Sequence, residues 1–433
     1  MLQSIRNAWK IEDIRKKFIF MCFILLLYRL GNAVPVPYVN TAELTGFFQT
    51  MRNTVLGLYN VMSGSAFSQA TIFALSIQPY INASIIIQLL AVAIPALERM
   101  MKEEGEEGKQ KMERITRYTT LAIALIQGYG YYVLLKNGYS DAYGAQHQLL
   151  TSSGPWTAIV IIASFTAGSC LLMWMGEQIT EFGLGNGISI ILFVSIVSRF
   201  PNQLITMVQN VVYGTATWWS QLLLLIGVLV LIVLIIVVND SERRIPVQYA
   251  KRVVGRKMYG GQSTHLPLKV NMSGVMPIIF AQSIASLPAT IASFVPAWRD
   301  GWFVKAFNTN TVLYMVIYFL LIVFFSYFYS TIQFNPIEIA NNLKKNGGFI
   351  PGFRPGKPTS EYLQKVLNKV TLFGAVYLGI IALAPLIVGA LMPNAANISF
   401  GGTSIIIVVG VALETVRQVE AQMLMRHYKG FLE

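Results

Sequence analysis

The side chains that most often carry enzyme chemistry are scattered in this sequence and form no catalytic pattern. The three histidines, His147, His265 and His427, lie far apart, and no HExxH motif provides the ligands of a zinc protease. Residues 352–358 (GFRPGKP) resemble a phosphate-binding loop, but the glycine spacing is too short and Pro358 replaces the magnesium-binding Ser or Thr. We therefore predict that the chain is not an enzyme and has no catalytic residue, cofactor or metal site. Any energy source must come from a partner.

The elements that carry these residues are strongly apolar. Of the 433 residues, 54% are hydrophobic and only 12% are charged, whereas a soluble domain carries about a quarter charged residues. A helix that crosses a bilayer needs about 20 mostly apolar residues. We therefore predict an all-α membrane protein with ten spans, at residues 18–37, 71–94, 115–135, 155–175, 187–208, 218–238, 273–295, 312–333, 370–392 and 402–424.

The basic residues predict the orientation of these spans. Of the 33 Lys and Arg residues, 27 lie in the segments on one side of the predicted spans and five on the other, and Arg29 lies within the first span. Cytoplasmic loops carry an excess of Lys and Arg. We therefore expect a multi-pass membrane protein with both termini in the cytoplasm. Loops 239–271 and 334–369 are longer than topology requires, which favours a second role in binding a partner.

Ten spans divide into two halves of five, residues 1–212 and 213–433, and an odd number in each half inverts the second half relative to the first. This arrangement is typical of an inverted repeat, in which a central site lies between the two halves. Within the first half, Ser63, Gly64 and Ser65 interrupt two apolar pieces and favour a turn. Non-helical backbone at membrane depth is tolerated where it faces protein or a water-filled cavity. The break therefore predicts a short re-entrant helix, at about residues 55–70, beside a cavity, and a re-entrant loop on the outer side is the alternative.

Several long motifs occur in order along the chain. They are residues 72–90 (IFALSIQPYINASIIIQLL), 173–181 (MWMGEQITE), 185–189 (GNGIS), 262–271 (QSTHLPLKVN), 341–345 (NNLKK), 351–356 (PGFRPG) and 400–404 (FGGTS). Together they resemble the SecY family of protein-conducting channels over nearly the whole chain. Ser65 and Ser76 stand where the family commonly has glycine. The resemblance implies a clamshell of two halves that moves preproteins across the membrane and releases apolar segments into lipid.

The resemblance also implies which residues form the channel. A narrow aliphatic ring excludes ions because it dewets, and it has no fixed polar ligand to oppose an arbitrary cargo. The ring residues implied by similarity are Ile77, Ile81, Ile188, Leu192, Ile279 and Ile407. The pairs 77/81 and 188/192 are spaced i,i+4, so each pair lies on one helix face. The implied plug residues are Tyr59, Asn60, Ser63, Gly64 and Ser65.

A side opening is implied between the second and seventh spans, with the third adjoining. The polar positions there are Asn82, Gln127, Gln282 and Ser283, and hydrogen bonds between membrane helices are weak enough, about 0.6 to 2 kcal/mol, for an entering signal helix to displace. For Gln282 the alternative remains that its side chain only makes a fixed structural contact between helices.

The implied partners are the SecE and SecG subunits, the SecA ATPase, a translating ribosome with its rRNA, preprotein signal sequences and membrane lipid. Cations on protruding turns suit acidic protein surfaces and rRNA phosphates. The residues expected to bind SecA or the ribosome are Arg243, Arg244, Arg252, Arg256, Lys257, Lys344, Lys345 and Arg354. For all of these residues except Arg354, the alternative remains that they serve only as a topology signal. Arg354 matches a functional arginine of the family. The alternative function is a secondary transporter with inverted repeats, which would need a mid-membrane charged site that we do not find.

The predicted topology is testable by single-cysteine labelling in a variant that lacks Cys22 and Cys170. A cysteine at Ser140 should react with an impermeant thiol reagent from outside, whereas one at Gly255 should react only after permeabilisation, because basic loops stay in the cytoplasm. Labelling at position 255 in intact cells would contradict the orientation.

Overall fold

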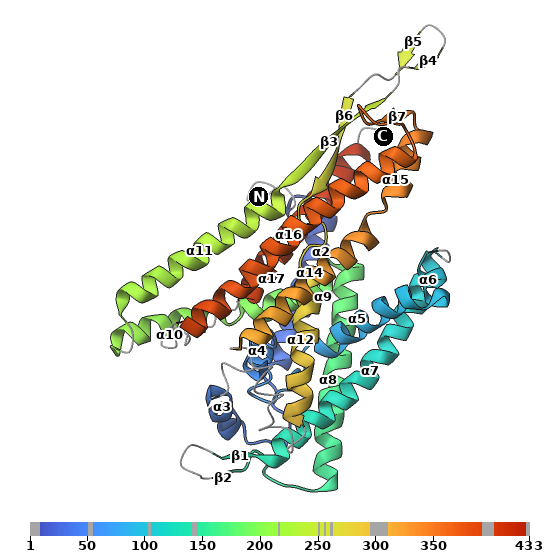
Figure 1. Ribbon diagram of the computed structural model, residues 1–433. Helices are drawn as coiled ribbons and strands as arrows, with labels where there is room; N and C mark the ends of the chain where they lie inside the picture. The colour runs from blue at the N-terminus through green and yellow to red at the C-terminus, as the bar shows by residue number, and fades with distance from the viewer. Residues whose placement is uncertain are drawn as a thin grey trace.

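The computed structural model describes the chain except residues 1–8, 51–54, 103–104, 141–145, 215–216, 250–251, 255–256, 260–262, 295–310, 392–401 and 430–433. The described part is a bundle of long helices with a slender β-hairpin at one end (Figure 1). The helices are α2 (Glu12–Gly31), α3 (Thr41–Thr50), α4 (Val55–Met62), α5 (Gln78–Ala93), α6 (Pro95–Lys102), α7 (Gly105–Asn137), α8 (Pro155–Phe182), α9 (Gly187–Val197), α10 (Phe200–Val212), α11 (Trp218–Asp240), α12 (Met276–Phe294), α14 (Val312–Gln333), α15 (Pro336–Lys345), α16 (Lys357–Leu391) and α17 (Gly402–Lys429).

The helices follow the predicted apolar runs, and the mostly helical membrane fold is confirmed. Among the described residues, five helical segments are long and apolar enough to cross a membrane, and the total of ten spans stays a prediction. The five are Pro155–Phe182, Gly187–Val212, Trp218–Asp240, Val312–Lys345 and Lys357–Ile387. The second of these is interrupted, because Ser198 and Arg199 separate α9 from α10. The run predicted at 71–94 becomes helical only at Gln78, where α5 begins with Pro79 in its first turn.

The predicted break in the first half is a series of buried turns. Residues 63–77 connect α4 to α5 without helix, and their backbone groups find partners within the protein. The amide of Ile72 donates to the carbonyl of Val34 (3.1 Å), and the amide of Val36 donates to the carbonyl of Ala70 (2.9 Å). Because each unsatisfied backbone group in an apolar medium costs several kcal/mol, these bonds allow the chain to leave the helix at membrane depth.

A close approach of two backbones fixes the position of the break against α8. A Cβ atom added at Gly168 of α8 would lie 2.0 Å from the carbonyl oxygen of Ile72, so only glycine fits this contact. On the other side, Phe67 stacks on Tyr131 of α7 with ring centroids 4.4 Å apart, and the Tyr131 hydroxyl donates to the Phe67 carbonyl. The turns are therefore held by two long helices of the first half.

The two long basic loops meet in one small β structure, which the sequence analysis did not anticipate. Strand β3 (Glu242–Tyr249) pairs with β6 (Ser263–Lys269) and, through Gln248 and Tyr249, with β7 (Gly348–Phe349). Short strands β4 (Arg252–Val254) and β5 (Lys257–Tyr259) extend the hairpin, and a further pair, β1 (Tyr139–Ser140) and β2 (Gln146–His147), lies at the opposite end of the molecule (Figure 1). A separate apolar cluster supports the three-stranded sheet, comprising Ile245, Val247, Leu268, Phe334, Ile350, Leu363 and Leu367.

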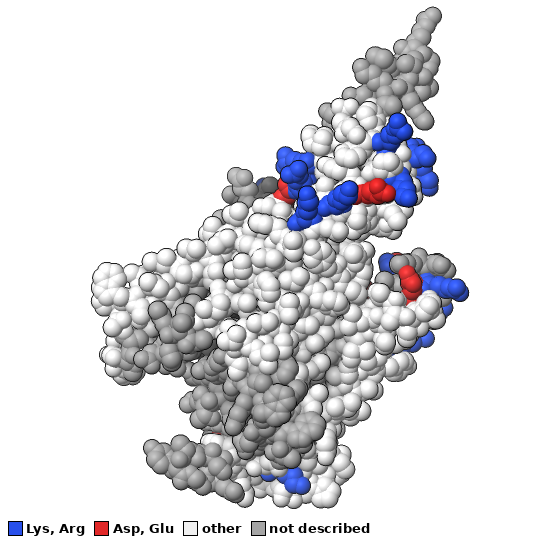
Figure 2. All heavy atoms as spheres, in the orientation of Figure 1, with Lys and Arg blue, Asp and Glu red and all other residues white. Residues whose placement is uncertain are grey.

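The charged residues gather where the hairpin is. On the face shown in Figure 2, most of the Lys and Arg side chains lie at the end that carries β3, β6 and α15 and at α6, a few lie at the opposite end, and the broad middle of the molecule is uncharged. At the base of the hairpin, the guanidinium of Arg417 in α17 pairs with the Asp240 carboxylate and donates to the Asn239 carbonyl (3.0 Å). The Asn239 side chain in turn accepts from Asn271 (2.8 Å). This network ties α11, the end of β6 and α17 together.

The turns between α4 and α5 hold three side chains in the left-handed backbone region. Ser65 (φ 76°), Ala70 (φ 43°) and Ser76 (φ 53°) have positive φ, a conformation that costs a residue with a Cβ roughly 1–2 kcal/mol. Glycine would adopt this conformation without that cost, so this chain stores strain at both serines.

Replacing Ser76 with glycine should relieve that strain and raise the free energy of unfolding by about 1 kcal/mol. Among the described residues, the buried Ser76 hydroxyl has no hydrogen-bond partner, so the substitution removes no contact of that kind. Thermal unfolding of the purified protein measures the change. The control is Ser164→Gly in α8, where glycine in a helix should be destabilising. Equal decreases for both variants would show that Ser76 is not strained.

Candidate functional site

The six predicted ring residues lie together in one buried apolar cluster. Five are almost fully buried, and Ile188 is partly buried and packs against the same cluster. The relative exposures are 1% for Ile77, 4% for Ile81, 1% for Leu192, 3% for Ile279 and 1% for Ile407. Ile77 is the N-cap residue before α5, Ile81 lies in α5, and the others come from α9, α12 and α17, so elements of both halves contribute to this shared apolar core.

The predicted plug lies beside this centre and contacts α12. Met62 at the end of α4 belongs to the same cluster, and its sulfur accepts from the Gln282 amide of α12 (3.1 Å). The Tyr59 hydroxyl shares a hydrogen bond with Ser286 of α12 (3.4 Å). On the other side, Gly64 (φ 66°) lies so close to α9 that an added Cβ would be 2.9 Å from the Ser195 carbonyl oxygen. The short helix is therefore held between α9 and α12.

The remaining predicted plug residues fold the turn upon itself. The Asn60 side chain accepts from the Ser68 amide (3.0 Å), and the Ser63 hydroxyl accepts from the Phe67 amide (3.1 Å). The carbonyl of Ser65 accepts from the Ser68 hydroxyl (3.1 Å). These side chains satisfy buried amides, so the polar residues that interrupt the apolar run also make the interruption stable.

The four predicted gate residues lie along the seam between α5, α7 and α12. The Ser283 hydroxyl accepts from the Gln78 amide nitrogen across the seam (2.9 Å). Asn82 and Gln282 are buried, and within the described chain the Asn82 amide nitrogen and the Gln282 amide oxygen have no hydrogen-bond partner. The seam is thus polar but only partly satisfied, and the unpaired polar atoms lower the stability of the contact between its helices.

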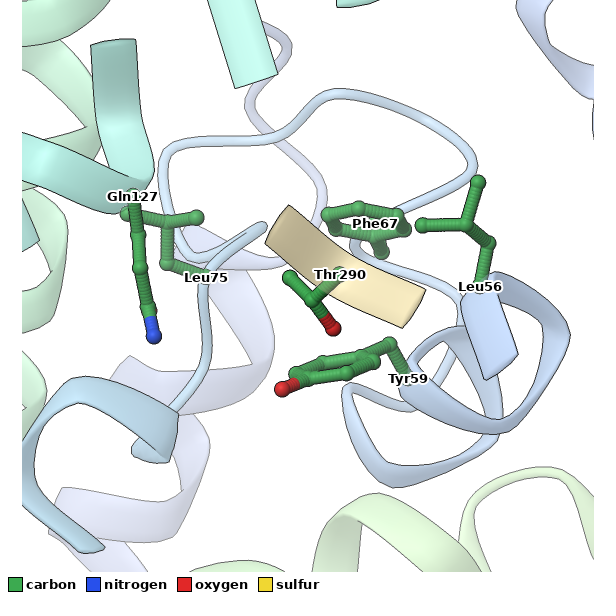
Figure 3. A pocket seen from close by; sticks show the side chains of 6 residues that line it. All are labelled: Leu56, Tyr59, Phe67, Leu75, Gln127 and Thr290. Atoms are coloured by element: carbon green, nitrogen blue, oxygen red, sulfur yellow. The ribbon is translucent and has the colours of Figure 1, made fainter. Parts of the chain in front are cut away.

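A small cavity lies where the turns meet this seam. Its lining comprises Leu56, Tyr59, Phe67, Leu75, Gln127 and Thr290 (Figure 3). Its volume of about 20 Å³ is enough for a single water molecule. Figure 3 shows Tyr59 and Thr290 close together and Gln127 on the other side of the space. Three of the six lining side chains are polar, so the site suits a water between the plug and the gate.

The predicted docking residues lie on the two joined loops. Arg243, Arg244, Lys344, Lys345 and Arg354 are exposed. Arg252 and Lys257 lie on β4 and β5, whereas Arg256 lies outside the described residues. Arg354 is held on a turn between Gly352 (φ 88°) and Gly356 (φ 103°), and its carbonyl accepts from the Thr359 hydroxyl (2.7 Å). The backbone is therefore fixed while the guanidinium points to solvent.

The sequence analysis missed several residues of the seam. Gln78 was quoted within a motif but given no role, although a glutamine at the first turn of an apolar helix is itself unusual. Ser286 and Thr290 follow Gln282 at i+4 and i+8, which places all three on one face of α12. That polar stripe within an apolar helix is a signal that could have identified them.

The chain is similar to known proteins over its whole length. The SecY family model matches residues 71–416. "Protein translocase subunit SecY" of Streptomyces coelicolor is 46% identical, with 100% of both chains covered, and that of Mycobacterium tuberculosis is 42% identical, also with 100% of both covered. A solved structure described as "The structure of a protein conducting channel" has a TM-score of 0.67 at 16% identity and covers 95% of this chain and 93% of its own. The canine "Sec61 in the Canine ribosome-channel complex from the endoplasmic reticulum" has a TM-score of 0.62 at 14% identity, with 95% and 93% covered.

The fold is that of a solved protein-conducting channel, and five described helical segments are long and apolar enough to cross a membrane, so the chain is a multi-pass membrane protein of this fold. The chain belongs to the SecY family of protein translocase subunits. The resemblance found from the motifs is therefore confirmed. The family comprises channel subunits rather than enzymes. Membership of this family does not favour the alternative that the chain is a secondary transporter.

Proposed function

We propose that this chain is the channel that moves unfolded preproteins across the bacterial cytoplasmic membrane and releases apolar segments sideways into lipid. The observation that carries the proposal is that all six predicted ring residues lie in or against the large apolar core shared by both halves, beside a re-entrant segment and a polar seam. Residues 1–212 and 213–433 act as the two halves of the clamshell, and the halves separate at the seam between α5 and α12.

The aliphatic centre acts as the seal. A narrow apolar constriction dewets, so it holds back ions without a fixed ligand. Met62 and the turns after it occupy the adjoining space at rest. An extended polypeptide has to displace α4, whose polar contacts to α12 include the two hydrogen bonds of Tyr59 and Met62. Such bonds are modest in a membrane, so displacement of the plug is energetically accessible.

Replacing Ile81, Ile188 and Ile279 together with threonine should make resting cells leak small ions, because each substitution replaces an ethyl group with a hydroxyl group, which wets and widens the constriction. A membrane-potential dye measures the leak, and immunoblotting measures the amount of protein. The matched control replaces the exposed Ile86, Ile159 and Ile205 with threonine and should stay tight. If the first variant leaks no ions although its protein amount is normal, these residues do not form the seal.

The basic loops are the cytoplasmic docking surface, for SecA or for a translating ribosome, with SecE and SecG completing the complex. The pairing of β3 with β7 supports one joint surface, because it brings Arg243 and Arg244 into the same body as Arg354. The similarity to ribosome-bound channels supports the ribosome as one partner. With this surface in the cytoplasm, both termini lie on the same side.

Arg354→Glu should reduce SecA-driven translocation into vesicles by about tenfold while the protein stays folded. Loss of one charge-assisted contact of roughly 1.5 kcal/mol corresponds to that factor, and an exposed substitution changes stability by only about 0.5 kcal/mol. Arg114→Glu on α7, also exposed, serves as the control and should translocate normally. Equal rates for both variants would mean that Arg354 contributes only to topology.

A further inference from the structure

A second polar contact joins α5 to the other half of the molecule, away from the four predicted gate residues. The Tyr329 hydroxyl of α14 donates a hydrogen bond to the Gln88 side-chain oxygen of α5. The two residues are 241 positions apart in the sequence, so this is a contact between halves. Tyr329 is buried, with 7% relative exposure.

The Gln88 side chain is held in the orientation that this contact needs. Its amide nitrogen donates to the Ser84 hydroxyl one helical turn earlier (3.0 Å). With its nitrogen engaged within α5, the amide presents its oxygen to the tyrosine. Ser84, Gln88 and Tyr329 therefore form a chain of two hydrogen bonds that ends on α14.

The tyrosine ring is also fixed from its own side. It lies 5.2 Å, centroid to centroid, from the ring of Phe280 in α12 and 5.7 Å from that of Phe328 in α14. Aromatic pairs at such distances contribute beyond their buried area. Because the ring packs on α12, the hydroxyl stays directed at α5 without relying on the hydrogen bond itself.

The two cross-seam bonds hold α5 at different heights. Gln78 contacts α12 at the start of α5, and Gln88 contacts α14 ten residues later, which is about 15 Å along the axis at 1.5 Å per residue. Tyr329 is near the end of α14 that leads to the basic loop at 334–369. The second bond is therefore at the end of the seam nearer the basic loops.

We propose that Tyr329 and Gln88 form a second latch of the side gate, with Ser84 as the residue that positions the glutamine. This inference rests on the proposed side gate. Separating α5 from the other half requires both latches to break, so each one adds separately to the hydrophobicity that an entering segment needs. The latch at Gln88 is the one that a segment arriving from the cytoplasmic side meets first.

The test is Tyr329→Phe, which removes the hydroxyl and keeps the ring. Model segments of graded hydrophobicity are scored for membrane insertion against export. Losing one interhelical hydrogen bond of about 0.6 kcal/mol should shift insertion about threefold in favour of less hydrophobic segments. Gln88→Leu combined with Tyr329→Phe should shift it no further than Tyr329→Phe alone if the two act as a pair. Ser84→Ala should give a smaller shift in the same direction.

Two controls separate this inference from the proposed gate. Tyr327→Phe in the same helix removes a hydroxyl that bonds to the Asn368 carbonyl within the second half, and it should leave the threshold unchanged. Ser283→Ala breaks the latch at Gln78, and its shift should add to that of Tyr329→Phe, since distant sites are usually additive. A shift with Ser283→Ala but none with Tyr329→Phe overturns the second latch alone. No shift with either variant, at normal protein amounts, overturns both the latch and the gate.

Discussion

The structure depends on one constraint, which is that backbone polar groups cannot be left unpaired at membrane depth. Residues 63–77 leave the helical conformation in the middle of the first half, and every feature of the site is arranged around that break. The turns pair with residues 34 and 36, with the side chains of Asn60 and Ser63, and with the Tyr131 hydroxyl. Close packing at Gly168 excludes any larger side chain there.

The break places two unlike surfaces next to each other. On one side is the aliphatic centre, which is buried and makes no polar contacts of its own. On the other is the polar face of α12, which makes one hydrogen bond to Gln78 of α5 across the seam and two to Met62 and Tyr59 of α4. Lipid tails are as apolar as the aliphatic side chains, so apolar contact alone does not hold two membrane helices together. In the channel that we propose, a few weak polar bonds keep the halves closed while still allowing them to part.

Much of the fold could be predicted from the sequence, because apolar length and basic loops depend on local composition. The ring pairs could be placed on common faces from their i,i+4 spacing, and the polar residues at 63–65 correctly predicted the break. The contacts between distant segments could not be predicted in this way. Gln78 and Ser283 are 205 positions apart, and nothing in either segment specifies the other. The pairing of β3 with β7 was missed for the same reason, and local patterns also gave no indication of the positive φ at Ala70.

The central claim is that a polypeptide passes through the aliphatic centre. Site-specific photo-crosslinking of a stalled secretory chain tests it most directly, with the reactive residue at Ile81 or at Ile86. Both are on α5, but Ile81 is buried in the centre at 4% exposure and Ile86 is on the outer surface at 43%. The account predicts a crosslink to the stalled chain from position 81 and none from position 86. Absence of a crosslink at position 81, or equal crosslinking from both positions, would contradict it.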